Sequence, residues 1–375
     1  PPPSIWTTFR LPSKNCKKGS DQPHLLEYFA LILAPYCHPF KFSDSFNIEG
    51  IRTREKSVLP NNQSTESYPP IGHITFAQNI QMPLAPRNIL VLLLTTASAY
   101  TEKLPVLQRE IVLEACTTSG ESAYNQIRKV FGQRSVESPD LFTGNHSEVE
   151  RIRIRDDPEV GACFDFYLNR DEDGDRDVVW PKGQRRQRNE IKGYKDSDNS
   201  LKAAHGQIAR YLWMFRINGE MSVTKEFCHF FQLKAVGGDN AVSPIFAISG
   251  SITDGRSQLE LRMRSAQHGS VKRKRISDWN SSRNKWIKIE CIACFNEEGY
   301  FRINLHSLDG SVWFRHEVIG MNTWREGSSF VRPKWGIYRS LEDKGRIANE
   351  EDVVSFARFR IQEWSDLGMP GLSKQ

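Results

Sequence analysis

The feature that most constrains the fold of this chain is a long series of short apolar segments separated by turn residues, beginning near Val149. These segments are short, rich in aromatic and β-branched residues, and bounded by Gly, Asn and Asp, which is the pattern of β-strands. Turns are expected at Gly237-Gly238-Asp239-Asn240, Asp254-Gly255, Glu298-Gly299 and Asp309-Gly310. Strands are expected at 163–168, 211–217, 227–233, 245–249, 258–264, 286–295, 300–306, 334–338 and 353–361.

Many short strands at this spacing predict an all-β sandwich, and a concanavalin-like jelly roll fits them best. The concave sheet of such a fold offers a groove long enough for a polysaccharide. One short amphipathic helix is expected within 120–131, where apolar residues recur at helical spacing. The prediction is therefore a short N-terminal helical segment at 100–140, followed by one jelly-roll domain at 141–375.

A different pattern precedes this region. Residues 82–87 form a short opening with Met82 and Arg87, 89–94 are an unbroken apolar run, and 97–99 match a small-residue cleavage site. That order is typical of a secretory signal peptide at 82–99, whereas a buried strand would explain the apolar run alone. Residues 1–81 then read as a translated upstream region or as a disordered extension.

A signal peptide places the protein outside the cell, where disulfides and glycans form. Asn145 and Asn280 each begin a glycosylation triplet. An odd number of cysteines follows the cleavage point, and a disulfide between Cys116 and Cys163 is the preferred pairing. The Cys291-Ile292-Ala293-Cys294 sequence lies in a strand pattern, where the odd offset sends the two sulfurs to opposite faces, so a metal site is not expected there.

Three strand segments carry polar side chains two residues apart, so that residues of the same parity share one face of a sheet. A solvated sheet face also alternates, but it rarely combines an arginine, an amide and a tyrosine within aromatic strands. The residues that these segments bring to one face are Arg188 with Glu190, Gln232 with Lys234, and Lys334 with Gly336 and Tyr338.

These segments resemble the strand motifs of jelly-roll alginate lyases. Arg188-Asn189-Glu190 is similar to their R-x-E strand, Gln232-Leu233-Lys234 to their Q-x-H strand with Lys in place of His, and 334–338 to their K-x-G-x-Y strand. The resemblance covers about residues 140–362. The stretches at 186–192, 229–232 and 335–340 look like fungal secreted lyases of the glucuronan lyase type.

The resemblance implies cleavage of a uronate polymer by β-elimination, in which the C5 proton leaves and the 4-linked oxygen is expelled. Gln232 and Arg188 would neutralise the uronate carboxylate, which stabilises the enolate-like intermediate. Tyr338 is the candidate base and acid. A free tyrosine has a pKa of about 10, so it needs cationic neighbours such as Lys334, Arg339 or Arg188 to act as a base near neutral pH.

The position of His229 is open, because it lies three residues before Gln232 and faces the other way in a regular strand. A β-bulge would bring it onto the site face, and it is otherwise a core histidine. Lys234 in place of the histidine favours glucuronan or a related uronate over alginate. Glu190 is expected to orient Arg188 by an ion pair. The expected substrate-binding residues are Lys234, Lys334, Arg186, Arg339 and Glu190.

An acidic stretch raises the question of a metal. Asp171, Asp173 and Asp175 surround a glycine turn, which suits a structural calcium ion, but Lys182 stands where an EF-hand requires its last glutamate. A solvated acidic turn is the alternative, and no cofactor is required for the reaction.

The net charge of +6 and the pI near 8.9 suit an acidic polysaccharide as the partner. The protein is expected to be a monomer that binds neither nucleic acid nor a membrane. The run Lys272-Arg273-Lys274-Arg275 is expected to be an exposed basic loop. Two other classes of jelly roll fit the sequence less well. A glucanase needs paired carboxylates on one strand, and no such strand is present. A non-catalytic lectin needs no Tyr338 beside Gln232 and Arg188.

Overall fold

The computed structural model describes residues 106–142, 146, 148–174, 185–265 and 270–365. The predicted signal peptide at 82–99, the segment 1–81, Asn145 and Asp175 lie outside these ranges. In the described part of the chain, no helix is long and apolar enough to cross a membrane.

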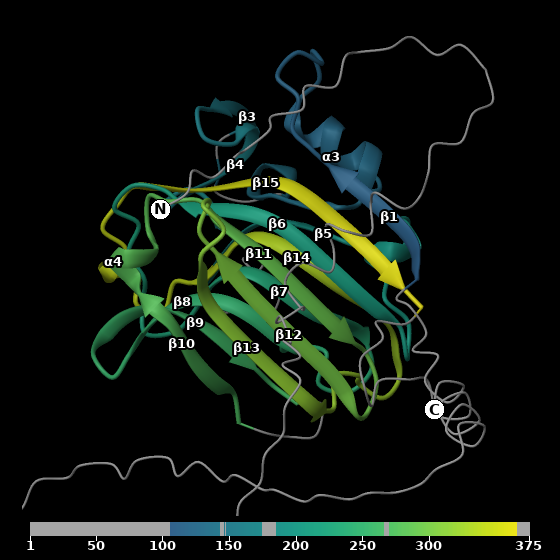
Figure 1. Cartoon of the computed structure of the whole chain (residues 1–375). Helices are drawn as coiled ribbons and strands as arrows, with labels where there is room; N and C mark the ends of the chain where they lie inside the picture. Colours follow the sequence, from purple (N-terminus) through teal and green to yellow (C-terminus); the bar gives the residue numbers. More distant parts are fainter. Residues whose placement is uncertain (1–105, 143–145, 147, 175–184, 266–269, 366–375) are drawn as a thin grey trace, which may run out of the picture. The chain divides into compact units, whose positions relative to one another are not determined.

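The described strands form two antiparallel sheets, which confirms the predicted jelly-roll sandwich (Figure 1). The first sheet has the order β13-β12-β11-β6-β15-β4-β3, with β1 paired to β15, and the second has the order β10-β9-β8-β7-β14-β5-β2. The strands of the first sheet are β1 (Leu107–Leu113), β3 (Ile152–Asp157), β4 (Gly161–Asn169), β6 (Ile208–Ile217), β11 (Ile287–Cys294), β12 (Gly299–His306), β13 (Val312–Met321) and β15 (Glu351–Trp364). Those of the second are β2 (Val136–Glu137), β5 (Arg186–Lys192), β7 (Cys228–Gly237), β8 (Phe246–Thr253), β9 (Arg256–Met263), β10 (Lys272–Asp278) and β14 (Ser328–Ser340).

Each strand expected from the sequence is present, and one region expected to be a loop is a strand. The basic run 272–275 lies in β10, the edge strand of the second sheet, which pairs with β9. The loop interpretation was therefore wrong. Exposed charged side chains on both faces hide the apolar alternation of an edge strand, and such charges protect the edge from pairing with another chain. Strand β13 was also not expected from the sequence.

The predicted helix is confirmed as α3 (Ala123–Phe131). Its N-cap is Ser122, whose hydroxyl accepts a hydrogen bond from the Asn125 amide, and Gly132 ends it at a φ of 98°. A second helix is short, α4 (Trp279–Ser282), and single 3-10 turns occupy Pro139–Leu141 (η1), Asn199–Leu201 (η3) and Lys344–Arg346 (η4). The segment 100–140 also supplies β1 and β2, so it contributes strands to both sheets.

The core lies between the two sheets and is dominated by aromatic rings. Trp335 on β14 is fully buried and contacts Trp213 and Phe231 at ring-centroid distances of 6.0 and 5.7 Å. Because side chains alternate, the residues next to Trp335 in sequence, Lys334 and Gly336, belong to the opposite face of the second sheet. The aromatic core therefore fixes which face of this sheet carries the polar side chains.

The preferred disulfide is not formed, since Cys116 and Cys163 are both free. Phe164 and Phe166 face the core, so alternation places Cys163 on the outer face of the first sheet, where it packs with Met214. The Cys116 sulfur instead lies 3.4 Å from the Thr118 hydroxyl. Both cysteines of the Cys291–Cys294 pair are buried, in two separate clusters, as the odd offset predicted.

Candidate active site

Strands β5, β14 and β7 are neighbours in the second sheet (Figure 1). Their pairing places the polar side chains of all three strands on one face. Tyr338 lies opposite Arg188, and Gly336 opposite Glu190. Lys334 lies opposite Gln232 on its other side. Directly opposite residues of antiparallel strands point to the same side, so these residues share one surface, which we call the site face.

Gly336 is required where β14 meets β5. Its φ is 142°, and a Cβ atom there would lie 2.1 Å from the Asn189 carbonyl oxygen and 2.7 Å from the Glu190 Cα. A side chain would therefore push β14 away from β5 and separate Tyr338 from Arg188. The glycine of the K-x-G-x-Y pattern has a structural reason in this chain.

A β-bulge turns His229 onto the site face. The register between β7 and β8 shifts between His229 and Phe231, so that Phe230 is an extra residue and both phenylalanines face the core. His229 consequently lies opposite Tyr338 on β14, with ring centroids 6.0 Å apart. It also stacks on Phe227 at 4.6 Å. The bulge that the sequence left open is present.

Tyr338 and His229 line one pocket of about 210 Å³, together with Gln232 and Arg186. Arg186 donates a hydrogen bond of 2.7 Å to the Tyr338 hydroxyl, and the Arg188 guanidinium lies 4.1 Å from the centre of the Tyr338 ring. The other residues that line the pocket come from elsewhere in the second sheet and its loops: Phe227, Val242, Ser243, Pro244, Arg262, Met263, Arg264 and Val271.

Burial sets the protonation states of these two rings. Burial raises the pKa of Tyr338, and the charges of Arg188 and Arg186 offset only part of that rise, so the phenol is protonated at neutral pH. Burial and the nearby charge of Arg262 lower the pKa of His229 well below its usual value, which leaves the imidazole neutral. Its Nδ1 atom has no hydrogen-bond partner among the described residues.

Beside the pocket lies a buried network of ion pairs. The Lys334 ammonium is 2.6 Å from a carboxylate oxygen of Glu137 and 2.6 Å from one of Glu190. Lys192 contacts Glu137 at 2.6 Å, and Arg188 lies 3.4 Å from Glu137 and 3.8 Å from Glu190. The expected ion pair between Arg188 and Glu190 is present, but Glu137 lies closer to Arg188, and both carboxylates are held by cations.

Across β2, β5, β7 and β14, cations outnumber carboxylates on the site face as far as the structure describes it. The six lysine and arginine side chains are Arg186, Arg188, Lys192, Lys234, Arg332 and Lys334, against the carboxylates of Glu137 and Glu190. Four positive charges therefore remain after pairing (six minus two). Such a surface attracts a polyanion and repels other cations.

Gln232 and Lys234 differ in how far protein partners already occupy their polar groups. The Gln232 amide donates one N–H to Glu190, and its second N–H can donate into the pocket that it lines. Lys234 makes no ion pair with any described carboxylate, unlike Lys192 and Lys334. Burial, together with the positive charges of Lys334 and Arg188, lowers the pKa of Lys234 to about 7.

Arg339 does not belong to this site. It follows Tyr338 by one residue, so its side chain points to the other side of β14, where the guanidinium donates 2.8 Å to Gln187 and pairs with Asp352. Arg339 is 2% exposed. The expectation that Arg339 binds substrate or acidifies Tyr338 was therefore wrong, because adjacent strand residues face opposite ways. Arg186 is the residue that contacts the phenol.

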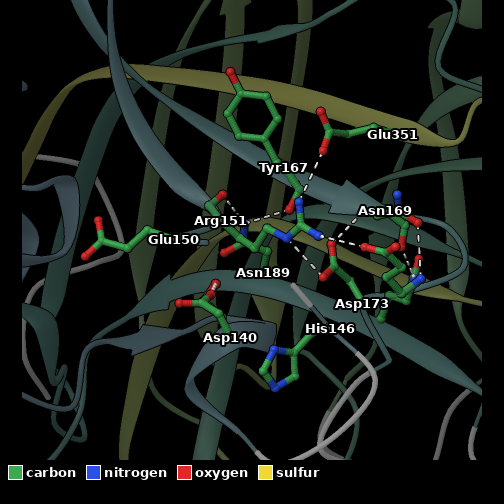
Figure 2. Close-up of polar contacts among 12 residues, drawn as sticks. Asp140, His146, Glu150, Arg151, Tyr167, Asn169, Asp173, Asn189 and Glu351 are labelled. Atoms are coloured by element: carbon green, nitrogen blue, oxygen red, sulfur yellow. Dashed lines mark hydrogen bonds and ion pairs between the residues drawn. The ribbon is translucent and has the colours of Figure 1, made fainter. Parts of the chain in front are cut away.

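The acidic stretch is bound to cations of the protein itself. Figure 2 shows Arg151 between Asp173 and Glu351, with nitrogen–oxygen distances of 3.0 and 3.2 Å. Asp171 contacts Arg170 at 2.7 Å and Lys344 at 2.6 Å. Within the described ranges no group of three or more acidic, His or Cys side chains is arranged to hold a metal. Asp171 is thus a partly exposed ion-pair partner, whereas Asp173 is fully buried beside Arg151 and does not belong to a solvated turn.

The site face continues beyond the pocket onto β9 and β10. Along one row, Gln232 lies opposite Ala247, Ala247 opposite Arg262, and Arg262 opposite Arg273. Arg275 lies opposite Glu260 and shares this face, whereas Lys272 and Lys274 alternate to the other side. Burial, together with the positive charge of Lys274, accordingly lowers the pKa of His316 on β13 of the first sheet.

Several residues of the site were not predicted from the sequence. Lys192 has the parity of Arg188 and Glu190 on the same strand, so its pattern was visible. Glu137 comes from a strand of two residues, which leaves no periodic pattern to detect. Arg262 and Arg264 reach the pocket through the order of strands in the sheet, which one sequence does not specify.

Comparisons with known proteins give fold likenesses only. No protein-family model matches this chain, and no curated protein matches its sequence. Among solved structures, it is similar to the endo-β-1,4-glucuronan lyase from the fungus Trichoderma reesei, with 15% identity, 61% of this chain and 94% of that chain covered, and a TM-score of 0.40. The marine alginate lyase from Aplysia kurodai shares 11% identity, with 68% and 98% covered and a TM-score of 0.43. Alginate lyase Aly36B shares 9%, with 68% and 97% covered and a TM-score of 0.46. At these identities and TM-scores, the chemistry has to be argued from the side chains of this chain.

Proposed function

We propose that this protein is a polysaccharide lyase that cleaves a uronate-containing polymer, glucuronan or a close relative, by β-elimination. The observation that carries the proposal is the pocket itself. A protonated phenol, a neutral imidazole and an amide, from Tyr338, His229 and Gln232, line one cavity on a face with excess positive charge. These groups match the demands of the reaction one by one.

The first demand is removal of the proton on C5 of the uronate. Burial keeps the imidazole of His229 neutral in the resting site, so a ring nitrogen is free to accept that proton. Negative charge then spreads onto the substrate carboxylate. The free N–H of Gln232 and the surrounding cations stabilise that charge in a buried setting, where electrostatic interactions are stronger than in water.

The second demand is departure of the 4-linked oxygen. The C4–O bond breaks as the C4=C5 double bond forms, and the leaving oxygen takes a proton from the Tyr338 hydroxyl. Burial keeps this hydroxyl protonated until it is needed, and the hydrogen bond from Arg186 stabilises the phenolate that remains. The imidazolium of His229 and the phenolate of Tyr338 then return to their resting states by proton exchange with water.

We also propose that the protein acts outside the cell. The layout of residues 82–99 supports this, and a polymeric substrate too large to cross a membrane agrees with it.

The proposal is tested by incubating the protein with glucuronan, alginate and a heparin-type chain while ultraviolet absorbance is followed. β-Elimination creates an unsaturated uronate at each new end, so absorbance should rise with glucuronan. A rise with alginate alone would correct the choice of polymer. Absence of a rise with every uronate polymer, while the protein still binds one of them, would refute the lyase and indicate a lectin.

The pKa of Lys234 predicts how activity depends on pH. Because this pKa is about 7, the side chain carries its charge below neutral pH and loses it above. If Lys234 binds a substrate carboxylate, kcat/KM should fall by up to tenfold per unit as pH rises through about 7. Lys234→Arg keeps a permanent charge, so this decline should disappear in the variant.

The opposite profile would assign Lys234 a different role. A free amine that abstracts the C5 proton is active only when deprotonated, so kcat/KM would rise through about pH 7. Lys234→Arg would then be inactive at every pH. The wild-type profile and the arginine variant therefore distinguish substrate binding by Lys234 from general base catalysis.

A further inference from the structure

Two arginines beside Ser243, of which only Arg264 lines the pocket, have no acidic partner among the described residues. Arg264, which follows β9, lines the pocket and donates 3.1 Å to the Ser243 hydroxyl. Arg325 donates 3.2 Å to the Ser243 carbonyl oxygen. Neither guanidinium lies within ion-pair distance of a carboxylate in the part of the chain that the structure describes, although most arginines of the site face have one.

The burial of Arg325 makes this arrangement costly to the fold. Arg325 is 1% exposed, and its Nε and Nη1 atoms have no hydrogen-bond partner among the described residues. The Nε atom of Arg264 is likewise buried without a partner. Burial and the neighbouring Arg264 lower the pKa of Arg325, but a guanidinium stays protonated at neutral pH. Two like charges that converge on one serine destabilise the protein unless an anion joins them.

We propose that Arg264, supported by the neighbouring buried charge of Arg325, forms a second anion-binding subsite, which takes the carboxylate of the uronate residue next to the one that is cleaved. This inference rests on the proposed function for the identity of its ligand. The backbone supports the placement: the Arg264 amide donates 2.8 Å to the Ile245 carbonyl, which fixes Arg264 beside Ser243. A planar carboxylate accepts hydrogen bonds from guanidinium groups in a bidentate manner.

The subsite explains a preference for consecutive uronates. Arg264 lines the same pocket as Tyr338, His229 and Gln232, so a sugar that reacts beside Tyr338 can present its neighbour to Arg264. A neutral sugar in that position would leave the buried arginines without an anion. Polymers in which uronates alternate with neutral sugars should therefore bind more weakly than a homopolymer.

The experiment measures binding without turnover, in a Tyr338→Phe background. Saturated tetraglucuronate and neutral cellotetraose are compared by calorimetric titration and by thermal unfolding. Tetraglucuronate should bind and raise the Tm, and cellotetraose should do so much less. Arg264→Gln should weaken tetraglucuronate binding by about tenfold to a hundredfold and leave cellotetraose unchanged, as expected for loss of charged hydrogen bonds. Arg315→Gln, an exposed arginine on β13, controls for net charge and should change neither.

Arg325→Met separates a binding role from a structural one. If the buried charge is kept for the ligand, this variant should have a higher Tm than its background without ligand, and a lower affinity for tetraglucuronate. Unchanged affinity in Arg264→Gln would overturn the proposal, and that variant decides the matter if Arg325→Met does not fold. Because the readout is binding, these results remain interpretable even if no polymer is cleaved.

Discussion

Replacing Tyr338 with phenylalanine should lower kcat on a cleavable uronate polymer by about 10²- to 10⁴-fold, the usual contribution of general acid–base catalysis. The change removes the proton donor of the leaving oxygen and the acceptor of the Arg186 hydrogen bond. The ring remains, so its contacts with Phe227 and with the Arg188 guanidinium persist. KM should consequently change little. Initial rates of absorbance increase over a range of polymer concentrations measure both constants.

Tyr211→Phe is the matched control for this prediction. Tyr211 is fully buried in the core, and its hydroxyl has no hydrogen-bond partner among the described residues. Loss of this hydroxyl removes an unsatisfied polar group, so kcat should stay the same and stability should not fall. Comparable activity in Tyr338→Phe and wild type would show that another group protonates the leaving oxygen.

Lys334→Met should lower the free energy of unfolding by about 3–5 kcal/mol, the cost of removing one partner from a buried ion pair. The ammonium lies between Glu137 and Glu190, and all three side chains are at most 3% exposed. Without it, Glu190 keeps Arg188 at 3.8 Å and the Gln232 amide, which do not replace a contact of 2.6 Å. Urea unfolding followed by fluorescence gives the difference.

The control is an exposed ion pair with the same nitrogen–oxygen distance. Lys344 contacts Asp171 at the same 2.6 Å, but the two side chains are 44% and 46% exposed. Lys344→Met should cost less than about 1 kcal/mol, because water screens the pair and solvates the carboxylate that remains. If the two variants lost the same free energy of unfolding, burial would not explain how much the stability of the fold depends on Lys334.

The sequence was sufficient for the parts of the fold that depend on alternation within one strand. Arg188, Glu190, Lys334 and Tyr338 share a face because their strands are regular and directly paired. The same rule explains why the expectation for Arg339 was wrong, since an odd offset from Tyr338 places Arg339 on the opposite side of β14. The rule therefore identified the face correctly wherever it was applied to a regular strand.

What the sequence did not reveal depends on contacts between distant strands. His229 reaches the site through an extra residue in β7, and no residue type next to His229 in the sequence marks the bulge. Arg325 and Arg264 are separated by 61 positions (325 minus 264), and only the folded chain brings both to Ser243. The isolation of these arginines from carboxylates becomes visible only when burial and distance are known for every neighbour.

The bulge at Phe230 has a consequence for how such sites are compared between proteins. It lets a histidine three positions before the glutamine occupy the surface that a histidine two positions after it occupies in an unbroken strand. A candidate site residue can thus stand at a different spacing in the sequence and still reach the same face of a sheet. A motif search that requires fixed spacings between residues will miss such a histidine. An alignment of residues by the face of the sheet that they occupy will find it.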